Sequence, residues 1–223
     1  LAVVGPVASG KSTLLKLTAG LLLPSGGRIL VHGRPLPDWR WDDYRNRIGY
    51  APQDSLLFSE SIRENVSMGR PVPAGADGSD WVHRVLAVAR MEDELAVLPQ
   101  GTETVLGQKG SKVSGGQRQR ISIARSIYGR PELLLLDDCT ASLDAENEDR
   151  LWAGLRAVLP DATVLLVSHR LATIRRADRI LVLDAGRLAD HGTHDELAIR
   201  CPVYRRFLER EEERAKVTAA AGD

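Results

Sequence analysis

The hydrophobic positions of this chain fall into short continuous runs and into longer stretches with helical spacing. Short apolar runs bounded by turn-forming sequence are typical of strands that a parallel sheet buries on both faces. Turn-rich sequence between the first few runs adds some hairpin character. We therefore predict an α/β chain with strands at Leu1–Val4, Arg28–His32, Arg47–Ala51, Leu133–Leu136, Thr163–Val167 and Ile180–Leu183.

Apolar residues three or four positions apart predict the helices. In Lys11–Leu21, the residues Leu14, Leu17 and Leu21 share one face, and Gly20 marks the end of the helix. After residue 53 the strand signals fade, and helical spacing takes over until about residue 130. This stretch predicts an inserted group of helices that includes Asp80–Arg90 and Gln117–Tyr128, the second with Ile121, Ala124 and Ile127 on one side.

These elements predict one domain that fills residues 1–223. Residues 1–53 and 131–200 form its α/β core, residues 54–130 a helical subdomain, and residues 201–223 a C-terminal helix and tail. Pro71–Ser79 is predicted to be an exposed loop, because it is rich in Pro, Gly and Ala. The charge run Glu209–Arg214 is typical of a solvated helix, and Ala219–Asp223 of a frayed end.

Composition narrows the class of protein. Thirty basic and thirty acidic residues give a formal charge of zero, so the basic footprint of a nucleic-acid-binding protein is missing. Cys139 and Cys201 have no metal-type spacing and suggest a reduced, cytosolic setting. No apolar run approaches the roughly 20 residues that span a bilayer. Because the apolar strand at Leu1 comes without an initiator Met or a signal-like segment, we expect the chain to be part of a longer protein.

The segment Gly5–Thr13 carries the clearest chemistry. Gly5-Pro6-Val7-Ala8-Ser9-Gly10-Lys11-Ser12 fits the P-loop pattern G-x-x-x-x-G-K-[ST], with a predicted strand before it and a predicted helix after it. Its backbone N–H groups would cradle phosphates, Lys11 would pair with the β and γ phosphates, and Ser12 would ligate Mg²⁺. Ala8 stands where glycine would be freer, which compromises backbone approach slightly.

Two further segments complete this picture. Val113-Ser114-Gly115-Gly116-Gln117, here called the signature segment, places a Gly-Gly pair at a helix start, where bare N–H groups and the helix dipole suit a second polyphosphate contact. The run of leucines that ends at Asp137 places a carboxylate at the end of a strand. An Asp there is more often a cap, but with a P-loop upstream it suits the Walker B aspartate that holds Mg²⁺.

The P-loop, the signature segment, Asp137-Asp138 and Ser168-His169-Arg170 follow one another in the order seen in the ATP-binding cassettes of ABC transporters. The resemblance covers nearly the whole chain. Within that family the chain resembles the exporter type in the segments Tyr50–Asp54, Phe58–Asn65 and Gly192–Leu197. It implies a P-loop NTPase (RecA-like) core with a mainly parallel sheet, a small antiparallel β part and an inserted α-helical subdomain.

The resemblance also implies roles for residues that would carry little weight alone. Gln53 resembles the glutamine near Mg²⁺ and the membrane-domain contact, and His169 the switch histidine that faces the γ-phosphate. Leu143 and Asp144 resemble the loop at the interface of two cassettes. The implied cofactors are ATP and Mg²⁺, with Ser12, Gln53 and Asp137 at the metal.

In this family two cassettes face each other head to tail, and each ATP lies between one P-loop and the signature segment of the other cassette. Ser114, Gly115, Gly116 and Gln117 are therefore expected to act on the partner's ATP. ATP binding closes the pair, hydrolysis reopens it, and the movement drives a transmembrane domain of the same or a partner chain. The resemblance places such a cassette at the cytoplasmic face of the cell membrane.

Asp138 departs from the family pattern, which usually has Glu after the Walker B aspartate to position or deprotonate the attacking water. Its side chain is shorter by one methylene, and a misplacement of about 1 Å can lower a rate about 10²-fold. We expect a slow or degenerate hydrolytic site, of the kind found in heterodimeric exporters. A second departure is Gln108, where exporters usually have an acidic residue. The third concerns the aromatic that stacks on adenine: in the family it lies upstream of the P-loop, and this sequence starts too late to include it.

Several functions fit these motifs. The leading one is the motor domain of an ABC exporter. A second is an ATP-gated clamp or regulatory module that works by binding with little hydrolysis. An importer cassette is a third, and a soluble ABC protein of translation or DNA repair is a fourth, against which the neutral charge and the exporter-like Ser61–Asn65 count. A homodimer with slow turnover and a heterodimer with one degenerate site would share the same sequence.

Overall fold

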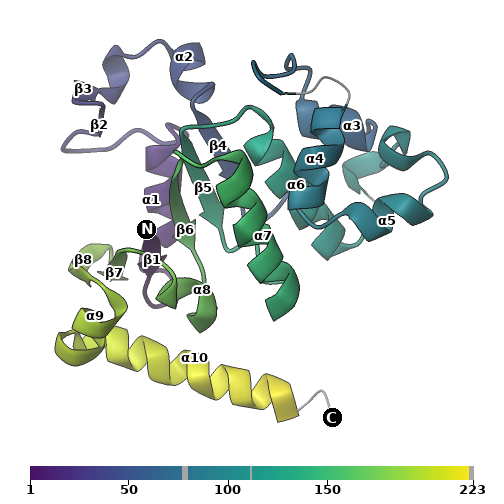
Figure 1. The fold of residues 1–223 in the computed structure, drawn as a ribbon. Coiled ribbons are helices and arrows are strands. Elements are labelled where there is room, and N and C mark those ends of the chain that lie inside the picture. The colour runs from purple at the N-terminus through teal and green to yellow at the C-terminus, as the bar shows by residue number, and fades with distance from the viewer. Residues whose placement is uncertain (77–79, 111, 221–223) are drawn as a thin grey trace. The chain divides into compact units, whose positions relative to one another are not determined.

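The computed structural model describes residues 1–76, 80–110 and 112–220 (Figure 1). The chain divides into two compact units. The first unit combines Leu1–Gly27 with Leu165–Asp223, and the second unit is Arg28–Val164. Parts of the predicted loop and tail, residues 77–79 and 221–223, lie outside the described residues.

A mostly parallel sheet forms the centre of the first unit. Strand β1 (Ala2–Val4) is fully buried and pairs in parallel with β6 (Thr163–Val167) on one side and β7 (Ile180–Asp184) on the other. These three strands confirm the predicted ones closely. Because parallel strands end at the same edge, the segments that follow β1, β6 and β7 emerge together.

The fourth strand, β8 (Arg187–Gly192), pairs antiparallel with β7 and was not predicted. Its side chains are mostly exposed, so the apolar run expected of a strand is absent. The β7–β8 turn uses Ala185 and Gly186, both with positive φ (47° and 76°), as a two-residue hairpin turn of type I′ requires.

Helix α1 (Lys11–Thr18) ends three residues before the predicted Leu21. Gly20 has a φ of +68°, and the N–H groups of Leu21 and Gly20 donate to the carbonyls of Lys16 and Leu17. This is a Schellman motif, which stops a helix at a left-handed glycine. Leu21 consequently lies beyond the helix and is 58% exposed, so its predicted place on one helical face with Leu14 and Leu17 was wrong.

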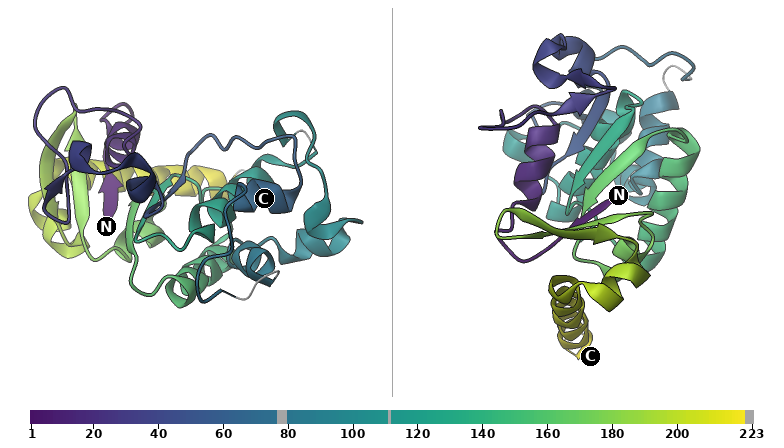
Figure 2. Two further views of the ribbon diagram at one scale, coloured as in Figure 1. Left: turned by 90° about the horizontal axis from the view of Figure 1, so that it is seen from above. Right: turned by 90° about the vertical axis from the view of Figure 1, so that its left-hand side faces the viewer.

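Three more helices complete the first unit. A short α9 follows β8 and leads into α10, a long unbroken helix below the β7–β8 hairpin (Figures 1 and 2). Tyr204 and Phe207 on α10 are buried, which fixes this helix to the rest of the unit. The bounds are α8 Leu171–Arg175, α9 His194–Arg200 and α10 Pro202–Ala220.

In the second unit, β4 (Ile48–Ala51) and β5 (Leu133–Asp137) pair in parallel, with Ile48 opposite Leu133. A two-residue hairpin, β2 (Leu30–Val31) with β3 (Arg34–Pro35), supplies the small antiparallel part. Gly49 lets helix α6 (Gly115–Tyr128) approach β4, because a Cβ there would lie 2.0 Å from the carbonyl oxygen of Ser126.

The other elements of the second unit are helical; η1 and α2 lie in sequence that was predicted only to be rich in turns. Helix α6 packs against β4, α3 and α4, and buries Ile121, Ala124 and Ile127, which confirms the predicted face. The bounds are η1 Leu36–Asp38, α2 Trp41–Arg45, α3 Ile62–Ser67, α4 Asp80–Val88, α5 Glu92–Val97, η2 Gly101–Glu103, η3 Gln108–Gly110, α6 Gly115–Tyr128 and α7 Ala145–Val158.

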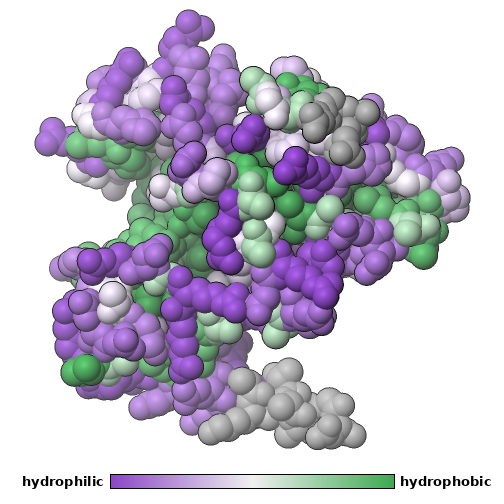
Figure 3. All heavy atoms as spheres, viewed as in Figure 1, coloured by the Kyte–Doolittle hydropathy of each residue, from purple (hydrophilic) through white to green (hydrophobic). Residues whose placement is uncertain are grey.

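Within the described residues, none of the helices combines the length and the apolar character that crossing a membrane would require. The surface drawn in Figure 3 is largely hydrophilic. The α/β class with a mostly parallel sheet and a small antiparallel part is confirmed by these pairings.

Candidate functional site

Gly5 begins the P-loop directly after the carboxyl end of β1. Its φ is +150°, and a Cβ there would lie 2.1 Å from the carbonyl oxygen of Leu183 and 2.8 Å from the hydroxyl of Ser9. The first of these neighbours is backbone and cannot move aside cheaply. Only glycine therefore allows the chain to leave β1 past the end of β7 and enter the loop.

Lys11 closes the loop from its other end. Its Nζ donates to the carbonyl oxygens of Gly5 and Pro6, both at 2.9 Å, and the side chain is only 9% exposed. The ammonium charge is therefore held within the curve of the loop. A positive charge in this place suits a bound polyphosphate.

The start of α1 follows at once. Gly10 is its N-cap, with a φ of 98° and no side-chain cap, and Ser12 and Thr13 lie in the first turn. An uncapped start presents N–H groups and the positive end of the helix dipole. The buried hydroxyl of Ser9 has no hydrogen-bond partner among the described residues. Both observations fit an anion seated against Gly5–Thr13.

Ala8 has a φ of 63°, in the left-handed region that alanine disfavours. The residue therefore carries the strain that its position in the P-loop pattern predicts. A left-handed L-residue costs roughly 1–2 kcal/mol.

We expect Ala8→Gly to stabilise the protein by about 0.5–1 kcal/mol, because the greater freedom of glycine in the unfolded chain offsets part of the relief. It should also tighten Mg-ATP binding a few-fold, since the loop backbone gains room. Denaturant unfolding and calorimetric titration measure the two effects. Ala185→Gly is the matched control, because Ala185 has a φ of 47° outside the P-loop. An equal change in affinity in both variants would contradict the explanation.

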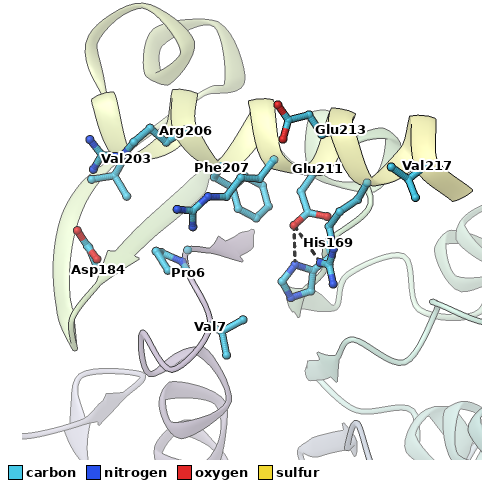
Figure 4. A pocket seen from close by; sticks show the side chains of 13 residues that line it. Pro6, Val7, His169, Asp184, Val203, Arg206, Phe207, Glu211, Glu213 and Val217 are labelled. Carbon is cyan, nitrogen blue, oxygen red and sulfur yellow. Dashed lines mark hydrogen bonds and ion pairs between the residues drawn. The ribbon is translucent and has the colours of Figure 1, made fainter.

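One cavity of about 850 Å³ joins the P-loop to His169 within the first unit (Figure 4). Gly5, Pro6 and Val7 line one side of it, and His169 and Asp184, which follow β6 and end β7, line another. Residues of α10 form the remaining wall. The structure thus brings together two of the predicted groups, the phosphate loop and the switch histidine, at the carboxyl edge of the strands.

In the second unit, Gln53 and Asp137 lie at the carboxyl ends of the paired strands β4 and β5. Asp137 is 2% exposed. Burial, and then the charge of Asp137, raise the pKa of Tyr50 on β4 to about 12, so the phenol stays protonated at neutral pH. Carboxylate and amide oxygens, such as those of Asp137 and Gln53, are the ligands that Mg²⁺ prefers.

Asp138 follows Asp137 and has a φ of 47°. Asp tolerates this left-handed conformation better than most residues. Beside it, burial raises the pKa of the Cys139 thiol to about 12, which keeps the thiol neutral and unreactive. The two carboxylates therefore supply the negative charge at the end of β5.

The signature segment begins α6 with a capping box. The hydroxyl of Ser114 accepts from the N–H of Gln117, and the Gln117 side chain accepts from the N–H of Ser114. Gln117 thus has a local role in the helix start, while Gly115 and Gly116 follow the cap. Gly115 and Gln53 line one cavity of about 330 Å³ in this unit.

Capping boxes also occur in two of the exporter-like segments. Ser61 with Glu64 caps α3, and Thr193 with Glu196 caps α9, both as complete capping boxes. Asp144, in the segment that resembles the inter-cassette loop, caps α7. An N-cap of this kind contributes about 1 kcal/mol.

Sequence reasoning missed Glu211. The charge run Glu209–Arg214 was predicted to be a solvated helix, but the Glu211 side chain is only 11% exposed and its Oε1 lies 3.2 Å from Nδ1 of His169. The helical position of Glu211, one turn after the buried Phe207, was the available signal.

Among the described residues, no group of three or more His, Cys, Asp or Glu could form a protein-only metal site.

Comparisons with known proteins agree with the fold described above. The sequence model of a family described as ABC transporter matches residues 1–141. The ATP-dependent lipid A-core flippase of Cupriavidus pinatubonensis is 43% identical over 203 residues, which are 91% of this chain and 34% of the flippase. The flippase of the same name from Paraburkholderia xenovorans is 40% identical, over 92% of this chain and 33% of its own length.

A solved structure of a bacterial Atm1-family ABC exporter with ATP bound is similar with a TM-score of 0.87 and 38% identity. The similarity covers 95% of this chain and 36% of that one. The chain spans about a third of the length of the curated relatives it matches.

Proposed function

Because this chain belongs to the ABC transporter family and is similar to exporter cassettes over more than nine-tenths of its length, we propose that it binds and hydrolyses ATP to power export. The observation that carries the proposal is the P-loop, with Lys11 folded into its curve and His169 in the same cavity. A transmembrane domain of the same or a partner chain would perform the export, with the cassette at the cytoplasmic face of the membrane.

In this proposal Gly5–Thr13 bind the phosphates of ATP through backbone N–H groups, and Lys11 supplies the positive charge. Ser12, Gln53 and Asp137 would hold Mg²⁺ through oxygen atoms. When bound, Mg²⁺ neutralises charge on the phosphate oxygens. The buried hydroxyl of Ser9, which has no hydrogen-bond partner among the described residues, is consistent with a polar occupant at the P-loop.

Two residues would serve hydrolysis. His169 contacts the γ-phosphate from the cavity that it shares with the P-loop, and Asp138 positions or deprotonates the attacking water. The Asp138 carboxylate can act as a general base, but its side chain is one methylene shorter than that of glutamate. We therefore expect this site to hydrolyse ATP slowly. Ser114, Gly115, Gly116 and Gln117 would act on the ATP of a second cassette.

An exposed apolar groove supports a membrane-domain partner. Phe58 and Met68 are about half exposed and, with Glu60 and Glu64, line a cavity of about 290 Å³. Asn65 fixes the backbone at Phe58 through two hydrogen bonds, of 2.8 and 3.0 Å. Apolar side chains held rigidly at the surface are typical of a docking face.

The test is the ATPase rate of the full-length protein in lipid, alone and with candidate partner cassettes. Slow turnover alone that rises when one partner is added would support an unlike pair. Fast turnover by the protein alone would exclude the heterodimer, and absence of Mg-ATP binding would exclude the proposed function. Tight binding with negligible hydrolysis under all conditions would favour the ATP-gated clamp, for which the short Asp138 is the specific observation.

The flippase names of the curated relatives suggest an amphipathic lipid as the exported substrate. ATP-dependent movement of a labelled lipid A-core molecule across vesicles that contain the full-length protein tests this suggestion. A rate that ATP does not change would exclude it.

A further inference from the structure

His169 is held from α10 by a carboxylate. Its Nδ1 lies 3.2 Å from Oε1 of Glu211, with side-chain exposures of 29% and 11%. Figure 4 shows the imidazole below Glu211, on the same side of α10 as the P-loop residues Pro6 and Val7. Arg214 also reaches this carboxylate, at 3.4 Å, but it is 70% exposed and contributes little.

The place of Glu211 is fixed by aromatic packing along α10. Tyr204 and Phe207 stack with ring centroids 6.2 Å apart, and the Phe207 ring lies 6.2 Å from the His169 ring. The hydroxyl of Tyr204 lies 2.9 Å from Nδ1 of His194 on α9. Burial raises the pKa of Tyr204 to about 12, so this hydroxyl keeps its proton at neutral pH. The carboxylate therefore meets His169 from a rigid helix.

A carboxylate can only accept a hydrogen bond, so Nδ1 of His169 must carry the proton that it shares with Glu211. The bond fixes the tautomer and the plane of the ring. Nε2 lies on the opposite side of an imidazole from Nδ1, and it is turned away from α10. The cavity on that side is the one that Gly5, Pro6 and Val7 line.

We propose that Glu211 is a positioning residue for ATP hydrolysis: it accepts from Nδ1–H of His169, and with ATP bound both ring nitrogens carry a proton, so that Nε2–H donates to a phosphate oxygen at the P-loop. The inference rests on the proposed ATPase function of this chain. It assigns part of that function to the C-terminal helix, far from the P-loop, the signature segment and Asp137 in the sequence. Glu211 acts through His169 and does not itself touch the nucleotide.

The test is a double-mutant cycle on the ATPase of the full-length protein. We expect Glu211→Ala to lower kcat about tenfold, the lower end of the cost for such supporting partners, with little change in KM. Glu211→Gln, which keeps an acceptor oxygen, should restore most of the rate. In the His169→Ala background, Glu211→Ala should have no further effect, because its target is gone. Glu212→Ala is the matched control, since Glu212 is the next residue on α10, is exposed, and is not among the residues that line the cavity.

An equal loss of rate in both backgrounds, or no rescue by glutamine, would overturn the proposal and leave Glu211 a purely structural residue of α10.

A second measurement is independent of hydrolysis. In protein labelled with ¹⁵N-histidine, the His169 signal should show a protonated Nδ1, and Glu211→Ala should remove this preference. An unchanged tautomer would overturn the proposal even in an active enzyme. Failure of the ATPase function would show instead as absence of Mg-ATP binding by the unaltered protein.

Discussion

Lys11→Ala is expected to weaken Mg-ATP binding at least about 100-fold. Each tenfold step corresponds to about 1.4 kcal/mol, so this loss is about 2.8 kcal/mol, within the 2–5 kcal/mol typical of removing one partner of a buried charge pair. The substitution removes the ammonium that donates to the carbonyls of Gly5 and Pro6, and with it the charge within the loop. Isothermal titration of Mg-ATP into the full-length protein measures the effect.

Lys16→Ala is the matched control for this prediction. Lys16 lies on the same helix, α1, and its side chain is exposed. Lys16→Ala removes the same charge and the same number of atoms as Lys11→Ala, but outside the loop, so its effect on Mg-ATP affinity should be small. Thermal unfolding of both variants shows whether the fold is kept. If Lys11→Ala binds Mg-ATP as tightly as the unaltered protein, Gly5–Thr13 is not the phosphate-binding loop.

The buried strands could be predicted from the sequence because they are the part of the fold in which one local signal decides the structure. β1, β5, β6 and β7 are continuous apolar runs, and such runs have few alternatives to burial in a sheet. β8 carries no such signal, since one strand at an edge needs no apolar face. Its only mark is the left-handed pair Ala185-Gly186, and a type I′ turn is easily overlooked when alanine takes the first position.

The candidate site was predictable where backbone geometry restricts the residue type. Gly5 is required by the carbonyl of Leu183, and Gly10 by its φ of +98° at the entry into α1, so both glycines appear in the sequence as a fixed pattern. The Glu211–His169 contact has no such pattern. It joins residues 42 positions apart, and it depends on how Tyr204 and Phe207 seat α10, which no local periodicity reveals.

Several residues that the sequence motifs singled out form capping boxes at helix starts. Ser114 and Gln117 were singled out for a phosphate of the partner cassette, and in the structure they also close the start of α6. Ser61 and Thr193 belong to segments that first served only as marks of a family, and each proves to be the cap of a helix. Short polar motifs of this kind therefore have a local energetic role, and the role that the resemblance implies for Ser114 and Gln117 stays a prediction.

Asp138→Glu is expected to raise the ATPase rate of the full-length protein by up to about 100-fold. The added methylene restores the reach that a general base needs, and a misplacement of about 1 Å is worth about 10²-fold in rate. The same substitution should lower the free energy of unfolding, by less than about 1 kcal/mol. Asp138 has a φ of 47°, and glutamate lacks the ease with which aspartate occupies that region. Activity and stability should thus change in opposite directions.

Steady-state ATPase assays and denaturant unfolding measure the two effects of this change. Asp149→Glu, an identical chemical change on the exposed side of α7, is the control and should alter neither. Asp138→Asn should remove whatever hydrolysis the unaltered protein has, because an amide cannot accept a proton from water. An unchanged rate in Asp138→Glu would mean that reach is not what limits this site. ATP would then act mainly by holding two cassettes together, and the clamp would replace the motor as the function of this chain.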